Sequence, residues 1–230
     1  YDPYTEMITR FHANDSLSIK MRQLVQLLSK KTSVPIKYFG LDASMLAAMD
    51  QKKSDIDLVV YGKKNAWLVR KAYENLIEDN NSKITSPLKM AKTIIKRRRS
   101  YSPLMTCKEI LEWEMSKISG YFMKTKFSVM PININGKYKT KYIPTNQFGA
   151  IRVKLKDSEI VCDPGITDLS RHEVSIIYGP DNITINQYIT FLPSRMGIFL
   201  KKGDTLFIIG KIYKTTSNNS TFALTQFPWD

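Results

Sequence analysis

Hydrophobic and polar positions follow two different rhythms along this chain of 230 residues. Through about residue 140, apolar residues recur at helical spacing, and short β-like runs stand between the helical segments. In order, we expect a helix at 17–28, strands at 34–39 and 56–61, and helices at 66–78, 87–99 and 106–120, then a strand at 127–132, with a short helix at 45–50. This mixture predicts an α+β unit with helices on a mixed sheet.

Start and stop signals support several of these elements. Pro87 suits the first position of a helix, where its missing N–H costs nothing. Thr106 and Glu109 have the spacing of a capping box, which satisfies two orphan N–H groups at a helix start. Gly62 is expected to stop the strand at 56–61, and Gly120 to end the helix that begins at Thr106.

From residue 141 the helical spacing disappears and short β-rich runs separated by turn residues take over. The runs lie at 150–156, 159–162, 173–178, 183–192, 205–213 and 221–226. Many short strands with regular turns are typical of a small closed barrel or a sandwich. We therefore predict two domains, a mixed domain at 1–140 and a small OB-like β-barrel at 141–230.

The charge of the chain changes the picture of its partners. The formal net charge is +14. Through residue 140 there are 25 Lys and Arg against 13 Asp and Glu, whereas the remainder has 10 against 8. A basic first domain favours anionic partners such as nucleotides, RNA or DNA, although a solvated lysine-rich face would also explain it.

Other classes of protein are disfavoured by what the sequence lacks. No run of about 18 apolar residues is present, so we expect no membrane span. Cys107 and Cys162 are far apart, and neither stands at zinc-ligand spacing from His12 or His172. A reducing, cytoplasmic setting fits this cysteine usage best. The oligomeric state is open.

Asp55 and Asp57 are the main candidates for chemistry. Alternation along a strand places both carboxylates on one face, about 7 Å apart, and turns Ile56 and Leu58 toward a core. Two adjacent carboxylates repel each other unless a cation lies between them. Mg²⁺ or Mn²⁺ would relieve that repulsion and could also bind phosphate oxygens, whereas two acids at an exposed strand start would need neither.

At these residues the chain resembles a known family. The turn Gly40-Leu41-Asp42-Ala43-Ser44, followed by the run SDIDLVVYG at 54–62, is similar to the nucleotidyltransferase superfamily of DNA polymerase beta. It is most similar to archaeal predicted nucleotidyltransferases with the same run. The resemblance implies transfer of a nucleoside monophosphate from a nucleoside triphosphate, with Asp55 and Asp57 as catalytic metal ligands. It implies phosphate-binding roles for Gly40, Ala43, Ser44 and Ser54, and Lys63 could reach a phosphate.

Two departures from the family pattern favour an alternative. Ala43 stands where the family has glycine, and the later strand at 126–132 contains no third carboxylate to deprotonate an attacking hydroxyl. The alternative is therefore an inactive nucleotidyltransferase fold that serves as a basic nucleic-acid-binding module. A weaker nucleic-acid surface is expected on the acid-free segment 83–99, at Lys89, Lys92, Lys96, Arg97, Arg98 and Arg99.

Overall fold

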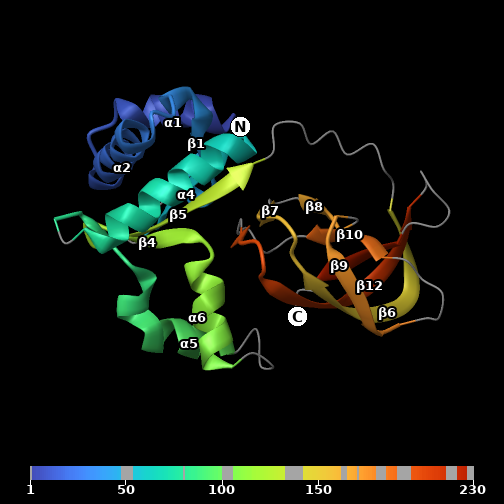
Figure 1. The fold of residues 1–230 in the computed structure, drawn as a ribbon. Coiled ribbons are helices and arrows are strands. Elements are labelled where there is room, and N and C mark those ends of the chain that lie inside the picture. Colours follow the sequence, from blue (N-terminus) through green and yellow to red (C-terminus); the bar gives the residue numbers. More distant parts are fainter. Residues whose placement is uncertain are drawn as a thin grey trace. The chain divides into compact units, whose positions relative to one another are not determined.

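The computed structural model divides the chain into two compact units, Tyr1–Ile134 and Asn135–Asp230 (Figure 1). It describes residues 2–47, 54–79, 81–99, 106–132, 142–161, 165–169, 171–179, 185–190, 198–215 and 222–226. The predicted domain boundary at 140/141 falls close to this division. Each unit is described below by itself.

The Tyr1–Ile134 unit combines helices with one five-stranded sheet, as the α+β prediction required. Its helices are α1 (Pro3–Phe11), α2 (Ser16–Thr32), α3 (Ala43–Leu46), α4 (Lys63–Glu78), α5 (Ala91–Arg99) and α6 (Cys107–Met115), with 3₁₀ turns at Ile36–Tyr38 and Pro87–Met90. Its strands are β1 (Phe39–Leu41), β2 (Ile56–Tyr61), β3 (Ile84–Thr85), β4 (Ile118–Phe122) and β5 (Thr125–Ile132). The strand order is β1-β2-β5-β4-β3. Only β2 and β5 pair in parallel, so the sheet is mixed.

Local signals explain several of these boundaries. The capping box is confirmed, because the Thr106 side chain accepts from the Glu109 N–H and the Glu109 carboxylate accepts from the Thr106 N–H. The prediction that Gly120 ends this helix is wrong, since α6 ends at Met115 and Gly120 lies in β4. A Cβ at Gly120 would come within 2.5 Å of the Thr85 carbonyl oxygen, so glycine permits close strand pairing there.

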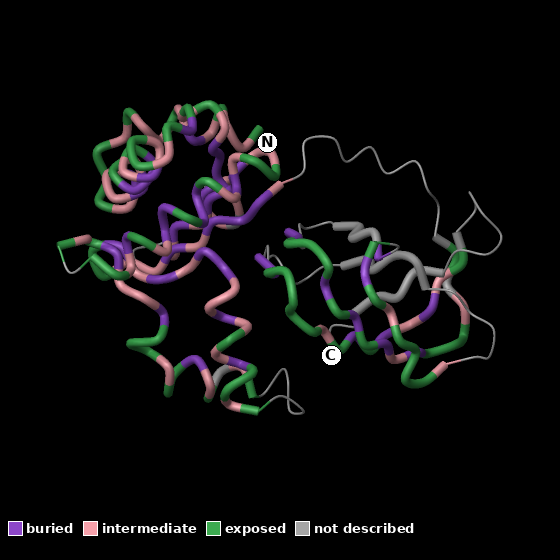
Figure 2. The backbone as a smooth tube through the Cα atoms, viewed as in Figure 1, coloured by how far each residue is buried: buried purple, intermediate pink, exposed green. Residues whose placement is uncertain are grey.

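One face of this sheet forms the core of the unit. Ile56, Leu58 and Phe127 are fully buried. The Tyr73 ring of α4 meets the Phe127 ring edge-on, with centroids 6.3 Å apart. Figure 2 shows most of the middle of the sheet as buried. The opposite face is built differently and carries the candidate site.

The Asn135–Asp230 unit is a β structure in which each predicted run overlaps a strand. The strand at Tyr142–Lys154 begins eight residues before its predicted run, and the strands at Gly165–Asp168 and Ile198–Leu200 were not predicted. Its strands are β6 (Tyr142–Lys154), β7 (Glu159–Val161), β8 (Gly165–Asp168), β9 (Glu173–Tyr178), β10 (Ile185–Thr190), β11 (Ile198–Leu200), β12 (Thr205–Thr215) and β13 (Phe222–Gln226). Six strands form a sheet in the order β8-β10-β13-β12-β6-β9, and β11 pairs with β7. Among the described strands, β8 and β9 are left as edges, so the predicted barrel is not closed there.

Within the described residues, no helix is both long enough and apolar enough to cross a membrane.

Candidate functional site

The two predicted aspartates lie on the second face of the first sheet. Asp57 is in β2 and Asp55 immediately precedes it. Parallel pairing sets Asp57 opposite Ser128 of β5, and β4 continues the row with Ser119. Lys126 and Tyr121 form a second row beside the first. We call this group the polar strip: Asp55, Asp57, Ser119, Tyr121, Lys126 and Ser128, all of which are half-buried.

Each aspartate of the strip already has a partner within the unit. The Lys126 ammonium donates to an Asp55 carboxylate oxygen, and the two side chains remain 38% and 34% exposed. The Ser128 hydroxyl donates to Asp57 Oδ1 at 2.7 Å. The carboxylates therefore share one face, as predicted, but β5 contributes an ammonium and a hydroxyl to them.

The surroundings of Asp57 disfavour the ionised form of its carboxyl group. Burial raises the pKa of Asp57, and the neighbouring charges of Asp55 and Asp42 raise it further. The Ser128 hydrogen bond and the Lys126 charge oppose these effects without cancelling them. Lys126 thus bonds directly to Asp55, whereas the hydrogen-bond partner of Asp57 is the Ser128 hydroxyl.

Asp42 is a neighbour of this site that the sequence reasoning did not assign. Antiparallel pairing of β1 with β2 brings Leu41 opposite Leu58, and the Asp42 N–H then donates to the Asp57 carbonyl at 2.9 Å. This contact depends on the pairing of two short strands, which the sequence alone does not predict. Even so, no three His, Cys, Asp or Glu side chains in the described ranges are grouped so that they could hold a metal ion.

The residues that the resemblance assigns to phosphate lie in several places. Ala43 and Ser44 begin α3, and the half-buried Ser54 precedes β2 next to Asp55. Lys63 is exposed at the start of α4, after the far end of β2, about 20 Å along the chain from Asp57. The structure therefore keeps Ser54 with the aspartates and separates Lys63 from them.

Gly40 has a packing reason to be glycine. It is buried in β1 opposite Val59, and a Cβ there would come within 2.8 Å of Pro3 Cβ and 3.0 Å of Val59 Cγ2. Pro3 belongs to α1, so the missing side chain lets this helix rest directly on the sheet. The glycine of the turn is thus accounted for without a phosphate.

The predicted basic surface is divided by the structure. The side chains of Lys89, Lys92, Lys96 and Arg99 are exposed. Arg98 instead donates to Glu114 of α6 at 2.6 Å, and the Lys117 ammonium donates to the same carboxylate at 3.1 Å. The side chain of Arg97 lies outside the described residues.

Glu114 is the centre of this buried cluster. Burial alone would raise the pKa of Glu114, but the charges of Lys117 and Arg98 outweigh it and leave the pKa lowered. Glu114 also lines a small pocket of about 50 Å³ together with Ser119, Tyr121 and Lys126. Glu114 is thus an acid from beyond residue 100 that lies near the strip, but its carboxylate is already bound to Arg98 and Lys117.

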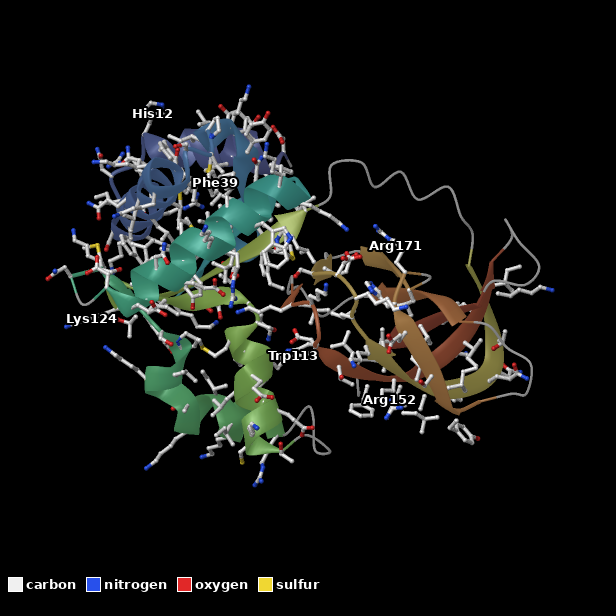
Figure 3. The ribbon with its side chains drawn as sticks, viewed as in Figure 1. His12, Phe39, Trp113, Lys124, Arg152 and Arg171 are labelled. Carbon is white, nitrogen blue, oxygen red and sulfur yellow. The ribbon has the colours of Figure 1, made fainter. Side chains whose placement is uncertain are left out.

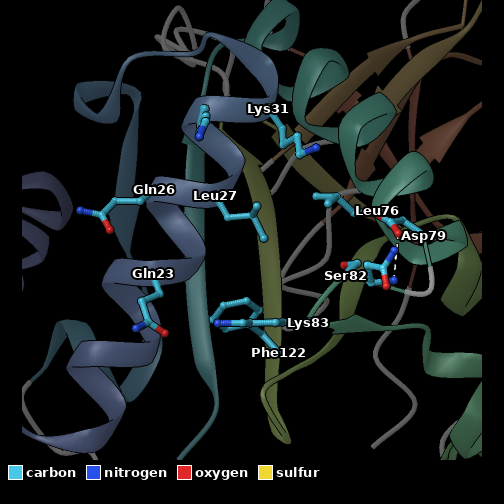
Figure 4. Close-up of a pocket in the computed structure, with 11 residues that line it drawn as sticks. Gln23, Gln26, Leu27, Lys31, Leu76, Asp79, Ser82, Lys83 and Phe122 are labelled. Atoms are coloured by element: carbon cyan, nitrogen blue, oxygen red, sulfur yellow. Dashed lines mark hydrogen bonds between the residues drawn. The ribbon is translucent and has the colours of Figure 1, made fainter.

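A wider hollow lies between α2, the end of α4 and the loop before β3 (Figure 4). Its volume is about 520 Å³. Leu27, Leu76 and Phe122 supply apolar walls, and Lys31 and Lys83 stand at the rim. None of the residues predicted from the sequence lines this hollow, and Phe122 belongs to the buried face of the sheet. It is a separate feature from the polar strip.

Comparison with known proteins adds one relative. The chain is 29% identical over 152 residues to an uncharacterized protein of the archaeon Methanocaldococcus jannaschii. The match covers 64% of this chain and 44% of that protein, so the chain spans less than half of the relative's length. No protein-family profile matches the chain, and no solved structure matches it. The functional argument therefore depends on the geometry of the strip.

Proposed function

We propose that the Tyr1–Ile134 unit binds a nucleoside triphosphate at the polar strip, together with one Mg²⁺ or Mn²⁺, as a nucleotidyltransferase-type domain. The observation that supports this is the pair of carboxylates on one sheet face, with the pKa of Asp57 raised by burial and by like charges. A divalent cation there would neutralise negative charge on the carboxylates and on the phosphates together.

The residues of the strip would fit one cation if the Lys126 ammonium moved away from Asp55. Asp55 and Asp57 would hold it, and the remaining ligands would come from the nucleotide phosphates. The Lys126 ammonium would have to leave Asp55, and its partly exposed side chain has room to turn toward a phosphate oxygen. Ser54, beside Asp55, is the nearest of the predicted phosphate-binding residues. The nucleotidyltransferase-like fold, like the OB-like barrel of the other unit, stays a prediction.

The reaction that this arrangement would serve is transfer of a nucleoside monophosphate to a hydroxyl group, with RNA as the class of acceptor to be tested first. A second candidate function is binding without transfer. It is favoured by Lys126 and Ser128, which occupy the β5 positions beside Asp55 and Asp57. Neither side chain can accept a proton from an attacking hydroxyl at neutral pH as a carboxylate does.

Calorimetric titration with a non-hydrolysable ATP analogue tests the binding site. We expect Mg²⁺-dependent binding that disappears when Asp55→Asn and Asp57→Asn are combined. The matched control is Glu78→Gln with Asp79→Asn, which removes the same charge from exposed positions at the end of α4. Equal binding by the strip variant and the control would contradict the proposed site.

Transfer is tested separately from binding. The chain is incubated with each labelled nucleoside triphosphate, Mg²⁺ or Mn²⁺, and a total RNA pool. Incorporation that depends on both aspartates supports the transferase. Magnesium-dependent nucleotide binding without incorporation selects the binding-only function.

A further inference from the structure

The β6–β12 pair of the Asn135–Asp230 unit leaves one apolar face uncovered within that unit. Along β12, Ile208 and Ile212 are buried, whereas Phe207 and Ile209 are 68% and 52% exposed. On β6, Phe148 is likewise 53% exposed. These are the inner strands of a sheet, where exposed large apolar side chains call for a functional explanation.

Register shows that these side chains form one surface. Phe207 stands opposite Arg152, Ile209 opposite Ala150 and Lys211 opposite Phe148. On the other side of β6, Ala150 pairs with Tyr178, which is 70% exposed. Side chains at paired positions lie about 5 Å apart, so they are neighbours on one face. We call this surface the outer face: Phe148, Arg152, Tyr178, Phe207, Ile209 and Lys211.

The outer face interleaves its aromatic rings with positive charge. Arg152 stands between Phe207 of β12 and Ser175 of β9, and its side chain projects away from the strands (Figure 3). Lys211 is paired with Phe148. The alternating outward positions 148–154 of β6 and 205–211 of β12 carry no acid, and on β9 Glu173 stands opposite Lys154 at the end of this surface. The charge balance of residues 141–230, 10 Lys and Arg against 8 Asp and Glu, conceals this local arrangement.

We propose that the outer face binds single-stranded nucleic acid, with bases stacked on Phe148, Tyr178 and Phe207. Arg152 and Lys211 take the phosphates. Every base offers a flat apolar face and every nucleotide a negative charge, which is the complement of interleaved rings and cations. A duplex hides its bases from such a surface. A second copy of the chain, seated face to face, would bring like cations together.

This inference does not depend on the nucleotide site, because the two surfaces belong to different units and share no residue. Its test uses the full chain and fluorescein-labelled oligouridylate of about 12 nucleotides, within the length that one small β unit can cover. Fluorescence anisotropy gives the dissociation constant. We expect the single strand to bind more tightly than a duplex of equal length.

Replacing the rings tests the stacking. Tyr178→Thr combined with Phe207→Thr keeps side chains that suit strands, and both positions are exposed, so the fold is retained. We expect affinity to fall at least about tenfold, given the usual contribution of one stacked base. The control is Leu68→Gln with Leu88→Gln, which changes two exposed apolar side chains in the other unit. Unchanged affinity in the Thr variant would overturn the proposal.

Replacing the cation tests the phosphate contact without touching the rings. Arg152→Gln should weaken binding and lower the slope of log affinity against log salt by about one. Arg171→Gln is the matched control, because Arg171 lies on another side of the same unit and faces Glu159 at 3.8 Å (Figure 3). Equal salt slopes for the two variants would count against the proposal.

Two further measurements separate this proposal from its rivals. An abasic strand of the same length and charge should bind at least about tenfold more weakly, since it offers nothing to stack. Equal binding of the abasic strand overturns the proposal, as does loss of binding only in a Lys89→Gln, Lys92→Gln, Lys96→Gln variant. Light scattering completes the test, because a Thr variant that changes only the oligomeric state identifies the outer face as a contact between copies.

Discussion

The Tyr1–Ile134 unit contains two ion-pair clusters, each of which joins a carboxylate to Lys or Arg, and they differ in how far water reaches them. In the polar strip, Lys126 and Asp55 keep 38% and 34% of their side chains exposed. In the other cluster, Glu114 and Lys117 are 7% and 4% exposed, and Arg98 completes it. One carboxylate thus meets a single cation near water, whereas the other meets two cations away from water.

The difference separates a replaceable ion pair from a fixed one. An exposed pair contributes at most about 1 kcal/mol, because water competes for both partners. A buried charge that loses its partner cannot recover that interaction from water. The Glu114 cluster therefore holds α5 against α6, and the Lys126–Asp55 pair is the one that the proposed cation would displace.

The largest expected effect comes from breaking the buried cluster. Glu114→Gln leaves Arg98 and Lys117 without a buried counter-charge, so the free energy of unfolding should fall by about 3–5 kcal/mol. Denaturant unfolding measures it. Glu112→Gln on the same helix is the control, since Glu112 is 64% exposed and only 3.7 Å from the exposed Lys108. A similar loss in both variants would erase the distinction between the clusters.

Acid should affect the same cluster in a defined direction. The pKa of Glu114 is lowered in the folded chain, so its stabilisation is present above its ordinary value of 4.5 and is lost as the pH falls through the lowered value. We expect wild-type stability to drop across that range more steeply than the stability of Glu114→Gln. Thermal melting from pH 6 to about pH 3 compares the slopes, and parallel curves would contradict this account.

An intermediate effect is expected when the strip loses its internal cation. Lys126→Met keeps the side-chain stem but frees Asp55, so a divalent ion no longer displaces an ion pair worth about 1 kcal/mol. Affinity for Mn²⁺ alone should then rise about fivefold. Electron paramagnetic resonance of free Mn²⁺ reports it. Weaker Mn²⁺ binding in this variant would show that Lys126 does not compete for the strip.

The smallest effect expected is a gain in stability. The pKa of Asp57 is raised by burial and like charge, so the stabilisation from its neutral form is lost as the pH rises through the raised value. At pH 7 the ionised group opposes folding. Asp57→Asn should therefore raise the melting temperature at pH 7 by about 2–4 °C, or roughly 1 kcal/mol. Calorimetry at pH 7 would contradict the idea by showing a fall.

The sequence predicted the elements of the site better than their neighbours. The strand at 56–61 was predicted at its observed bounds, because five apolar or aromatic residues and Gly62 define it locally. The roles of Lys126 and Asp42 were not predicted, because they follow from which strands pair and in what register. Those choices are made by packing across the sheet, and one residue of slippage would turn every side chain to the other face.

The same limit explains two other differences. Strand β4 was not predicted because Gly120 was interpreted as a helix end. Glycine is needed there because the Thr85 carbonyl of a neighbouring strand leaves no room for a side chain. In the other unit, turn residues located six of the strands but not β8 and β11. Their order in the sheet, and therefore the aromatic outer face, was beyond any local pattern.

The packing of Pro3 against Gly40 and Val59 has a consequence for any shortened version of this chain. The first helix is the cover of the strand that carries Asp57, and Met7 within it is fully buried. Val59 and Asp57 point to the same face of β2, so a version begun after residue 12 would open a gap on the face that carries the carboxylates, next to Asp57.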